Sequence, residues 1–399
     1  MLLRPDTLAL TALLALLTAV GPTSTDMYLP SLPAIGRTFG ASVPQVQLTL
    51  SAFLFCFAIG QVVYGPLSDH FGRKPLLLTT LAIYVAASIG CTLAVSIEML
   101  IVLRGVQAFG VAGAPVLARA IVRDLYAGAR AGREFSRMGA IMALAPAIAP
   151  SLGAILQTTV GWQASFYLMA AFGICAFAMV TVLLPETLKS ASLGFSLPAV
   201  VRNYGAFASH GRFMLYTAIV ATSYGGLFAW ISGSSFVLQD IYGLSALAFG
   251  LVFAATTLGY LTGTLLATKM VNRLGLDRTI VWGGVALAAG GLAMVATTIM
   301  DLRSPLALAL PVVVYLVGLG LALPQSMAGA LTPFPERAGA ASSTLGFTQQ
   351  VAASSIGILV GHTLGQSALP LALTIAAMGL SALALALYNQ SVRARDGTI

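Results

Sequence analysis

Two ionisable side chains stand out because they fall within long apolar stretches. Asp26 follows the apolar run that begins at about Leu8, and Arg104 lies inside the run that begins near Glu98. A charge at the centre of a bilayer costs about 2.5–3.5 kcal/mol even on insertion-based scales, so such groups usually have a partner or a task. A carboxyl withdrawn from water favours its protonated form and a nearby guanidinium favours the ionised form, so this pair has the chemistry of a proton carrier. The alternatives are a solvated Asp26 that caps the turn before Pro30, and an Arg104 that only hydrogen-bonds backbone carbonyls.

A polar segment between two apolar runs is the second candidate, and it reads Gly65-Pro66-Leu67-Ser68-Asp69-His70-Phe71-Gly72-Arg73-Lys74. Glycines let helix ends approach each other and make tight turns. An acid beside two bases can form ion pairs that hold one conformation and break in another. We expect a loop here after a helix, with such ion pairs. The simpler interpretation is an ordinary polar turn.

The composition indicates where these residues must lie. Of 399 residues, 58% are hydrophobic and only 8% are charged. Soluble domains carry about 25% charged residues, so lipid must cover much of this surface. The net charge of +8 comes from basic residues in short gaps between apolar runs, which favours membrane topology over nucleic-acid binding. The three cysteines and three histidines show no disulfide or metal-ligand spacing, so we expect no metal and no cofactor.

Apolar runs of about 20 residues, enough to span a bilayer, recur along the chain. They predict an all-α membrane protein with twelve spans, at about 8–28, 45–67, 75–94, 99–121, 135–157, 163–184, 212–235, 245–267, 279–299, 305–327, 341–364 and 370–388. The first run has no small-residue cleavage pattern, so we interpret it as a retained span rather than a signal peptide. Most Lys and Arg fall on one side of these spans, and only Arg37 and Arg303 fall on the other. The side rich in Lys and Arg, with both termini, is therefore expected to be cytoplasmic, in a bacterial inner membrane.

The longest polar connection divides the predicted spans into six and six. We expect an N-terminal half at 1–188, a cytoplasmic connecting segment at 189–211 and a C-terminal half at 212–399. A shift of 203 residues relates the halves, since it aligns Leu8 with Gly211 and Gly72 with Gly275. Two such pseudo-symmetric halves are typical of alternating-access carriers.

The same shift places Ala229 opposite Asp26 and Ala307 opposite Arg104. The titratable chemistry is therefore confined to the first half. Asn272 stands opposite Asp69, so the second copy of the polar segment lacks the acid.

Several segments resemble signatures of the major facilitator superfamily. The polar segment is similar to the family's cytoplasmic loop motif, which Gly65, Asp69, Gly72, Arg73 and Lys74 fit. The run Arg104-Gly105-Val106-Gln107-Ala108-Phe109-Gly110 resembles the family's fourth-helix motif, whose Arg is linked to proton transfer. The run from Ala145 to Ala154 resembles the antiporter signature through Pro146, Pro150 and Gly153, although Ala149 and Ala154 stand where glycine is commoner. The run Thr25-Asp26-Met27-Tyr28-Leu29-Pro30-Ser31-Leu32-Pro33 resembles the bicyclomycin and chloramphenicol resistance subgroup of drug/proton antiporters.

This resemblance covers nearly the whole chain, and it implies a monomer with the major facilitator fold. It implies that Asp26 and Arg104 couple transport to protons. It also implies that Asp69 and Arg73, together with Asp124, form a latch that holds one conformation.

A mostly apolar cavity with few polar groups suits lipophilic cargo. Candidate substrate-contacting residues are aromatic, Met or Gln side chains in the spans, namely Tyr28, Phe53, Phe57, Gln107, Met142, Tyr224, Phe228, Phe347 and Gln350. Most aromatics at helical spacing only pack, which is the alternative interpretation for each of them.

We therefore expect a carrier that exports small amphiphilic compounds, such as chloramphenicol- or bicyclomycin-like antibiotics, in exchange for protons. A proton-coupled carrier of a metabolite such as a nucleoside or amino acid is the first alternative. A membrane enzyme would need a nucleophile–base pair or an acidic cluster in the spans, and none is evident. ATP-driven pumping lacks its phosphate-binding motif. The expected partners are a small-molecule substrate, protons and the lipid bilayer, without nucleic acid.

Overall fold

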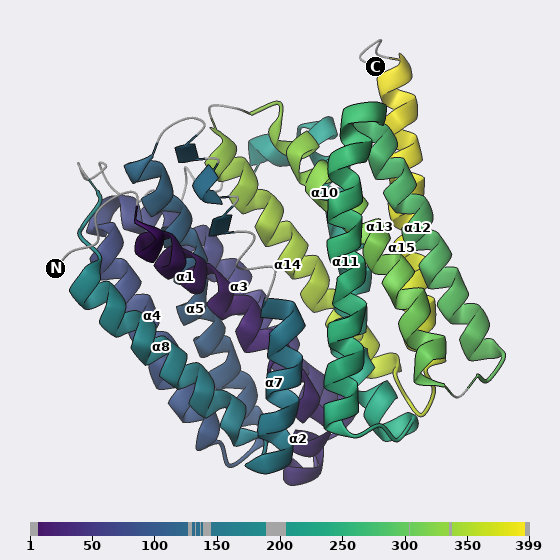
Figure 1. Cartoon of the computed structure of the whole chain (residues 1–399), viewed down its shortest axis with the longest axis horizontal. Helices are drawn as coiled ribbons and strands as arrows, with labels where there is room; N and C mark the ends of the chain where they lie inside the picture. The colour runs from purple at the N-terminus through teal and green to yellow at the C-terminus, as the bar shows by residue number, and fades with distance from the viewer. Residues whose placement is uncertain are drawn as a thin grey trace. The chain divides into compact units, whose positions relative to one another are not determined.

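The computed structural model describes residues 7–126, 130–131, 133–135, 137–138, 145–188, 205–302, 304–334 and 337–395. All regular structure within these ranges is helical, without a strand. The chain forms two compact units, Met1–Ser196 and Leu197–Ile399 (Figure 1). Each unit is described by itself.

The first unit begins with a helix that is interrupted near its C-terminal end. Its elements are α1 (Leu8–Asp26), the 3-10 turn η1 (Leu29–Ser31), α2 (Leu32–Phe39), α3 (Val43–Phe71), α4 (Arg73–Thr92), α5 (Ile97–Leu125), α7 (Ala145–Thr159) and α8 (Gln163–Leu183). Side chains cap several helix starts, because the first backbone N–H groups of a helix have no partner within it. Thr7 accepts a hydrogen bond from the Leu10 N–H, and Ser96 accepts one from the Met99 N–H.

The fifth helix organises the first unit, since α5 packs against α1, α3 and α4, while α8 packs on α4 (Figure 1). An apolar core joins α1, α4, α5 and α8, with Leu13, Leu77, Leu117 and Val180 all buried. Small residues let α3 and α5 approach closely, because a Cβ on Gly60 would lie 2.7 Å from that of Ala112. The site residues on α1 and α5 are therefore held by a tightly packed frame.

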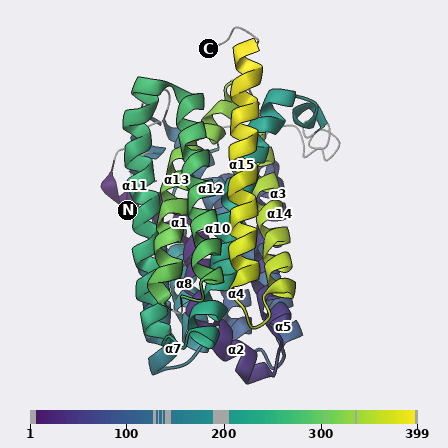
Figure 2. The ribbon, with the colours of Figure 1, turned by 90° about the vertical axis from the view of Figure 1, so that its right-hand side faces the viewer.

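The second unit repeats this arrangement of helices. Its elements are α10 (Gly211–Phe236), the π-helical turn η2 (Val237–Ile241), α11 (Ala246–Leu274), α12 (Leu276–Ile299), α13 (Pro305–Leu331), α14 (Ala338–Thr363) and α15 (Leu369–Arg395). Helix α12 packs against both α13 and α15, and α10 packs against α13, α14 and α15 (Figure 2).

The shift of 203 residues also relates the helix boundaries. Helix α3 ends at Phe71 and α11 at Leu274, and each is followed by a single glycine with positive φ, 94° at Gly72 and 80° at Gly275. Only glycine adopts such a conformation without strain. The two units therefore use the same one-residue break between consecutive helices.

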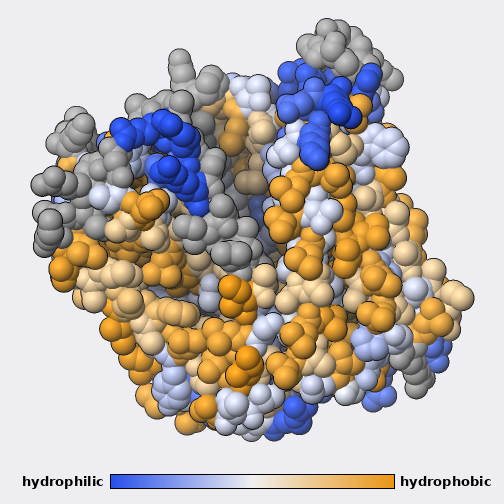
Figure 3. Space-filling model, in the orientation of Figure 1, coloured by the Kyte–Doolittle hydropathy of each residue, from blue (hydrophilic) through white to orange (hydrophobic). Residues whose placement is uncertain are grey.

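Ten helices are long and apolar enough to cross a membrane within the described ranges. Two expected spans are not among them: the one at 135–157, of which α7 is described from Ala145, and the one at 341–364, which coincides with α14. Among the described residues, ten of the twelve predicted spans are thus matched by helices long and apolar enough to cross a membrane. Large apolar side chains point outward from these helices, for example Val102 (65% exposed) and Leu310 (62% exposed). Hydrophobic residues cover most of the face seen in Figure 3. Such a surface suits lipid rather than water.

Candidate functional site

Asp26 is the last residue of α1, and its side chain is only 7% exposed. The helix stops there because Met27 and Tyr28 form a turn and η1 then begins at Leu29, followed by a proline that has no N–H to donate. The carboxyl is thus buried at a helix end, not solvated in a loop. The alternative of an idle, water-exposed cap does not fit this position.

Two neighbouring helices hold the turn after Asp26. The Ser165 hydroxyl of α8 donates a hydrogen bond of 3.3 Å to the Met27 carbonyl. Helix α7 crosses the same carbonyl so closely that a Cβ on Gly153 would lie 2.0 Å from its oxygen. Packing therefore requires a residue without a Cβ at Gly153, and this contact sets the position of α7 beside the buried carboxyl.

Arg104 lies on α5 and is fully buried. One terminal nitrogen, Nη1, donates to the Gln107 side-chain oxygen at 2.6 Å and to the Ser24 carbonyl at 3.3 Å. Its Nε and Nη2 have no hydrogen-bond partner among the described residues. The guanidinium carbon lies 4.2 Å from the ring centre of Phe53 and 4.6 Å from that of Tyr28. Aromatic faces thus stabilise a cation that has few acceptors.

A chain of hydrogen bonds extends from Arg104 across three helices. The Gln107 amide nitrogen donates to the Ser88 hydroxyl on α4 at 2.7 Å, and Ser88 donates to the Tyr84 carbonyl at 2.7 Å. The Tyr84 and Ser24 hydroxyls share a further hydrogen bond of 2.7 Å, which returns to α1. Both ends of the Gln107 amide are therefore engaged inside the first unit.

Asp26 and Arg104 are not joined directly. No ion pair between the described side chains links them, whereas Arg104 contacts the carbonyl of Ser24, two residues before Asp26. The buried acid and the buried base are thus connected through the α1 backbone.

The polar segment is not a loop, contrary to the sequence-based expectation. Residues Gly65 to Phe71 continue α3, Gly72 alone breaks the chain, and Arg73 is already the first residue of α4. Polarity alone does not indicate an irregular backbone, because the last turns of a helix that leaves the membrane are polar as well.

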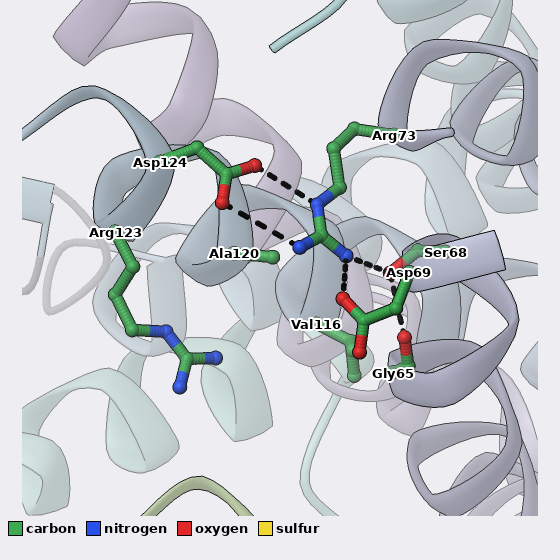
Figure 4. A pocket seen from close by; sticks show the side chains of 8 residues that line it. All are labelled: Gly65, Ser68, Asp69, Arg73, Val116, Ala120, Arg123 and Asp124. Carbon is green, nitrogen blue, oxygen red and sulfur yellow. Dashed lines mark hydrogen bonds and ion pairs between the residues drawn. The ribbon is translucent and has the colours of Figure 1, made fainter. Parts of the chain in front are cut away.

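Arg73 is the centre of the ion-pair cluster at this point (Figure 4). Its Nε donates to Asp124 on α5 at 2.9 Å, and its Nη1 lies 2.5 Å from Asp69, one turn earlier in α3. The Nη1 atom also donates to the Ser68 hydroxyl. A cavity of ≈ 300 Å³ adjoins the cluster and is lined by Gly65, Ser68, Asp69, Arg73, Val116, Ala120, Arg123 and Asp124. The structure thus brings together the three predicted latch residues within the first unit, joining α3, α4 and α5.

Glu186, which the sequence did not single out, completes this cluster. Its carboxylate accepts hydrogen bonds from the backbone N–H groups of Arg73 (3.0 Å), Lys74 (3.1 Å), Thr187 (2.8 Å) and Leu188 (2.8 Å). Partial burial opposes the charged form, but these N–H donors outweigh it and lower the pKa of Glu186 below its usual value. The side chain therefore caps the start of α4 as an anion.

Lys74 joins the start of α4 to α8, because its Nζ donates to the Thr181 carbonyl at 2.8 Å.

A signal for Glu186 was present in the sequence, since it is an acid that directly follows a span on the side rich in Lys and Arg.

The second unit has a different polar cluster at the equivalent corner. Asp277, at the start of α12, forms an ion pair with Arg393 of α15. It also accepts hydrogen bonds from the Tyr216 hydroxyl at 2.6 Å and from the Asn389 amide at 3.0 Å. Sequence reasoning missed this cluster, because its members are far apart in the chain.

The predicted substrate-contacting residues fall into three groups. Tyr28, Phe53 and Gln107 surround Arg104, and Phe57 stacks on Phe53 with ring centres 6.2 Å apart. In the second unit, Phe228 is buried on α10, while the partly buried residues are Tyr224, Phe347 and Gln350. Met142 lies outside the described residues. Of the two prolines in the run that resembles the antiporter signature, Pro150 is buried inside α7, and the side chain of Pro146 lies outside the described residues.

A family model described as Major Facilitator Superfamily matches residues 14–358. The chain is 30% identical to a bicyclomycin resistance protein homolog of Haemophilus influenzae, over 91% of this chain and 92% of that protein. It is 33% identical to a chloramphenicol resistance protein of Pseudomonas aeruginosa, over 84% of this chain and 79% of that protein. The structure resembles that of a D-xylose-proton symporter with a TM-score of 0.74 and 14% identity, covering 95% and 96% of the two chains.

Proposed function

Because this chain belongs to the Major Facilitator Superfamily, we propose that it exports small amphiphilic drug-like compounds in exchange for protons. The similarity to proteins named for bicyclomycin and chloramphenicol resistance supports antibiotics of these kinds as cargo. The family membership and these relatives indicate a transporter rather than an enzyme.

The burial of Asp26 is the observation that carries the proton-coupling part of the proposal. A carboxyl that is 7% exposed at the end of a membrane helix changes charge only when its surroundings change. Arg104 contacts the carbonyl of Ser24 on the same helix, so movement of α5 against α1 alters the field at the carboxyl. Substrate binding and protonation of Asp26 then become alternatives, so that bound substrate displaces the proton.

The energetic scale of this exchange is adequate. A charge that crosses a membrane gains about 2.3 kcal/mol per 100 mV. One proton that moves down roughly 180 mV thus supplies about 4 kcal/mol, which corresponds to roughly a thousandfold concentration ratio.

The architecture that we propose has twelve spans in two halves, 1–188 and 212–399, joined by the cytoplasmic segment 189–211. Both termini face the cytoplasm, and the protein acts as a monomer in a bacterial inner membrane. The cluster of Asp69, Arg73 and Asp124 acts as a conformational latch, because its ion pairs join three helices, α3, α4 and α5. Substrate contacts are proposed for the aromatic residues Tyr28, Phe53 and Phe228.

The experiment compares efflux by the wild type with that by Asp26→Asn at equal expression in cells and in inverted vesicles. We expect Asp26→Asn to remain folded and to retain some substrate binding, but to lose proton-linked transport, because the amide cannot titrate. Arg104→Ala is expected to reduce transport as well. Glu98→Gln is the matched control, since Glu98 is an exposed acid in the first turn of α5.

Active efflux that persists undiminished in Asp26→Asn would remove this residue from the mechanism. The direction of proton flux on adding substrate to inverted vesicles separates export from its alternative, because antiport and symport of a metabolite give opposite signs.

A further inference from the structure

A groove in the second unit is lined by none of the residues proposed for transport. It has a volume of ≈ 560 Å³ and lies between the first turns of α10 and the last turns of α15, two helices that pack against each other. Its lining consists of Gly211, Arg212, Met214, Leu215, Ala218, Tyr388, Asn389, Val392 and Arg393. Most of these residues are apolar, and the two charged ones are both arginines.

The lining changes from basic to apolar along the helix axes. Arg212 stands at the start of one candidate span, Gly211–Ile241, and Arg393 at the end of another, Leu369–Arg393. At 1.5 Å per residue, Ala218 lies about 9 Å deeper than Arg212, and Tyr388 lies about 7.5 Å deeper than Arg393. The groove therefore runs from the end of the spans, where headgroups lie, into the hydrocarbon zone.

Two large side chains that line the groove are exposed. Tyr388 is 61% exposed and Met214 is 40% exposed. Tyrosine is enriched at the level of lipid headgroups, where its ring is apolar and its hydroxyl is wet. Hydrophilic residues gather around the C-terminal end of α15, next to a hydrophobic surface (Figure 3).

The charges at this end of the second unit favour an anion. The nearby acid, Asp277, is satisfied by Arg393, Tyr216 and Asn389. Arg212 adds a second positive charge on the groove wall, and the lining residues include no acid. Guanidinium groups bind phosphate oxygens well, since their N–H donors match the spacing of those oxygens.

We propose that this groove binds an anionic phospholipid. The phosphate lies between Arg212 and Arg393, and one acyl chain runs along Leu215 and Ala218. A free phosphate would leave this apolar wall uncovered, whereas a lipid covers both parts. The proposal is independent of the cargo and of proton coupling.

The test measures lipid binding to the purified full-length protein in detergent by native mass spectrometry. We expect dioleoyl phosphatidylglycerol to bind more tightly than dioleoyl phosphatidylethanolamine, whose headgroup has no net charge. Arg212→Gln should weaken phosphatidylglycerol binding about fivefold, the effect of one basic residue near an anionic surface. Arg273→Gln is the matched control, because Arg273 is exposed in the last turn of α11 and does not line the groove; binding should be unchanged.

A second variant addresses the apolar part. Ala218→Trp should weaken phosphatidylglycerol binding by filling the groove while keeping both arginines, and thermal unfolding of each variant checks that it is folded. Equal affinity for the two lipids, or equal losses in Arg212→Gln and Arg273→Gln, would overturn the proposal. Competition by glycerol phosphate at concentrations equal to the lipid would instead indicate a free-phosphate site, and would overturn it too.

Discussion

Replacement of Gly153 by alanine tests the contact that holds α7 against the turn after Asp26. The added Cβ would lie 2.0 Å from the Met27 oxygen and 2.8 Å from the Met27 carbonyl carbon. Ordinary contacts begin at 3.4 Å, so the two helices must separate by about 1.4 Å, or the turn must change shape. Backbone atoms, unlike the end of a flexible side chain, cannot rotate away.

The expected cost is that of overpacking a well-packed interior, about 1–3 kcal/mol. We expect Gly153→Ala to lower the thermal unfolding midpoint of the purified protein in detergent, followed by tryptophan fluorescence or by size-exclusion chromatography after heating. Because Met27 is adjacent to Asp26, we also expect efflux to fall at equal expression. Gly153→Val should show both effects more strongly.

Gly36→Ala serves as the control, since Gly36 is a glycine of α2 in the same region. A Cβ there would lie 3.5 Å from its nearest neighbours, which is ordinary contact, and alanine favours helix. We expect an unchanged or slightly raised midpoint. If Gly153→Ala melts at the wild-type temperature, α7 does not contact Met27 as the structure has it, and the reasoning about this corner of the site is refuted.

Two further changes address the polar clusters of the first unit. Glu186→Gln removes the anion that caps α4, and we expect a loss of about 1 kcal/mol, because the side chain is only partly buried and water screens its charge. The folded state lowers the pKa of Glu186, so its contribution to stability is present above the ordinary pKa of 4.5 and is lost as the pH falls through the lower, folded value. The unfolding midpoints of wild type and variant should therefore converge in acid. A difference between the midpoints that stays constant with pH would contradict the cap. Gln107→Leu removes an acceptor of Arg104 and a donor to Ser88, so we expect a loss of about 2–3 kcal/mol in unfolding free energy. Gln107→Glu should restore much of this loss, because its carboxylate accepts from the guanidinium. Equal unfolding midpoints for the two variants would contradict the role of Gln107 as an acceptor for Arg104.

The two units place different chemistry on equivalent positions. The shift of 203 residues aligns Lys74 with Asp277 and Glu186 with Asn389. Both pairs are in contact: Glu186 accepts from the Lys74 N–H, and Asn389 donates to Asp277. The acid stands after the last helix of the first unit but at the start of α12 in the second. The repeat thus preserves a contact between these two positions, although the acid stands at the other position of the pair.

Hydropathy and Lys/Arg placement were enough to predict an all-helical membrane protein and most helix positions. The predicted span at 305–327 begins where α13 begins, and the span at 163–184 differs from α8 by one residue. These predictions succeed because an apolar run of sufficient length has few alternatives in lipid other than a helix. The ends were less accurate, as for α3, which continues to Phe71 through polar residues.

The partners of the site residues were beyond the sequence. Arg73 and Asp124 are 51 residues apart, and Thr11 and Glu134, which also share a hydrogen bond of 2.7 Å, are 123 apart. Which side chains meet depends on the rotation and crossing of packed helices, and no local pattern specifies it.

By itself, the sequence determined that lipid surrounds this protein and approximately where its helices span the bilayer. It also determined the two charges that are unusual within those spans. The tertiary structure alone decided that Arg104 contacts aromatic rings and donates to the carbonyl of Ser24, without an ion pair to Asp26. It also decided that Glu186 caps α4. The physical reason is one of range. Burial and helix formation follow from neighbours within a few turns, whereas hydrogen-bond partners are chosen by the packing of helices that are distant in the chain.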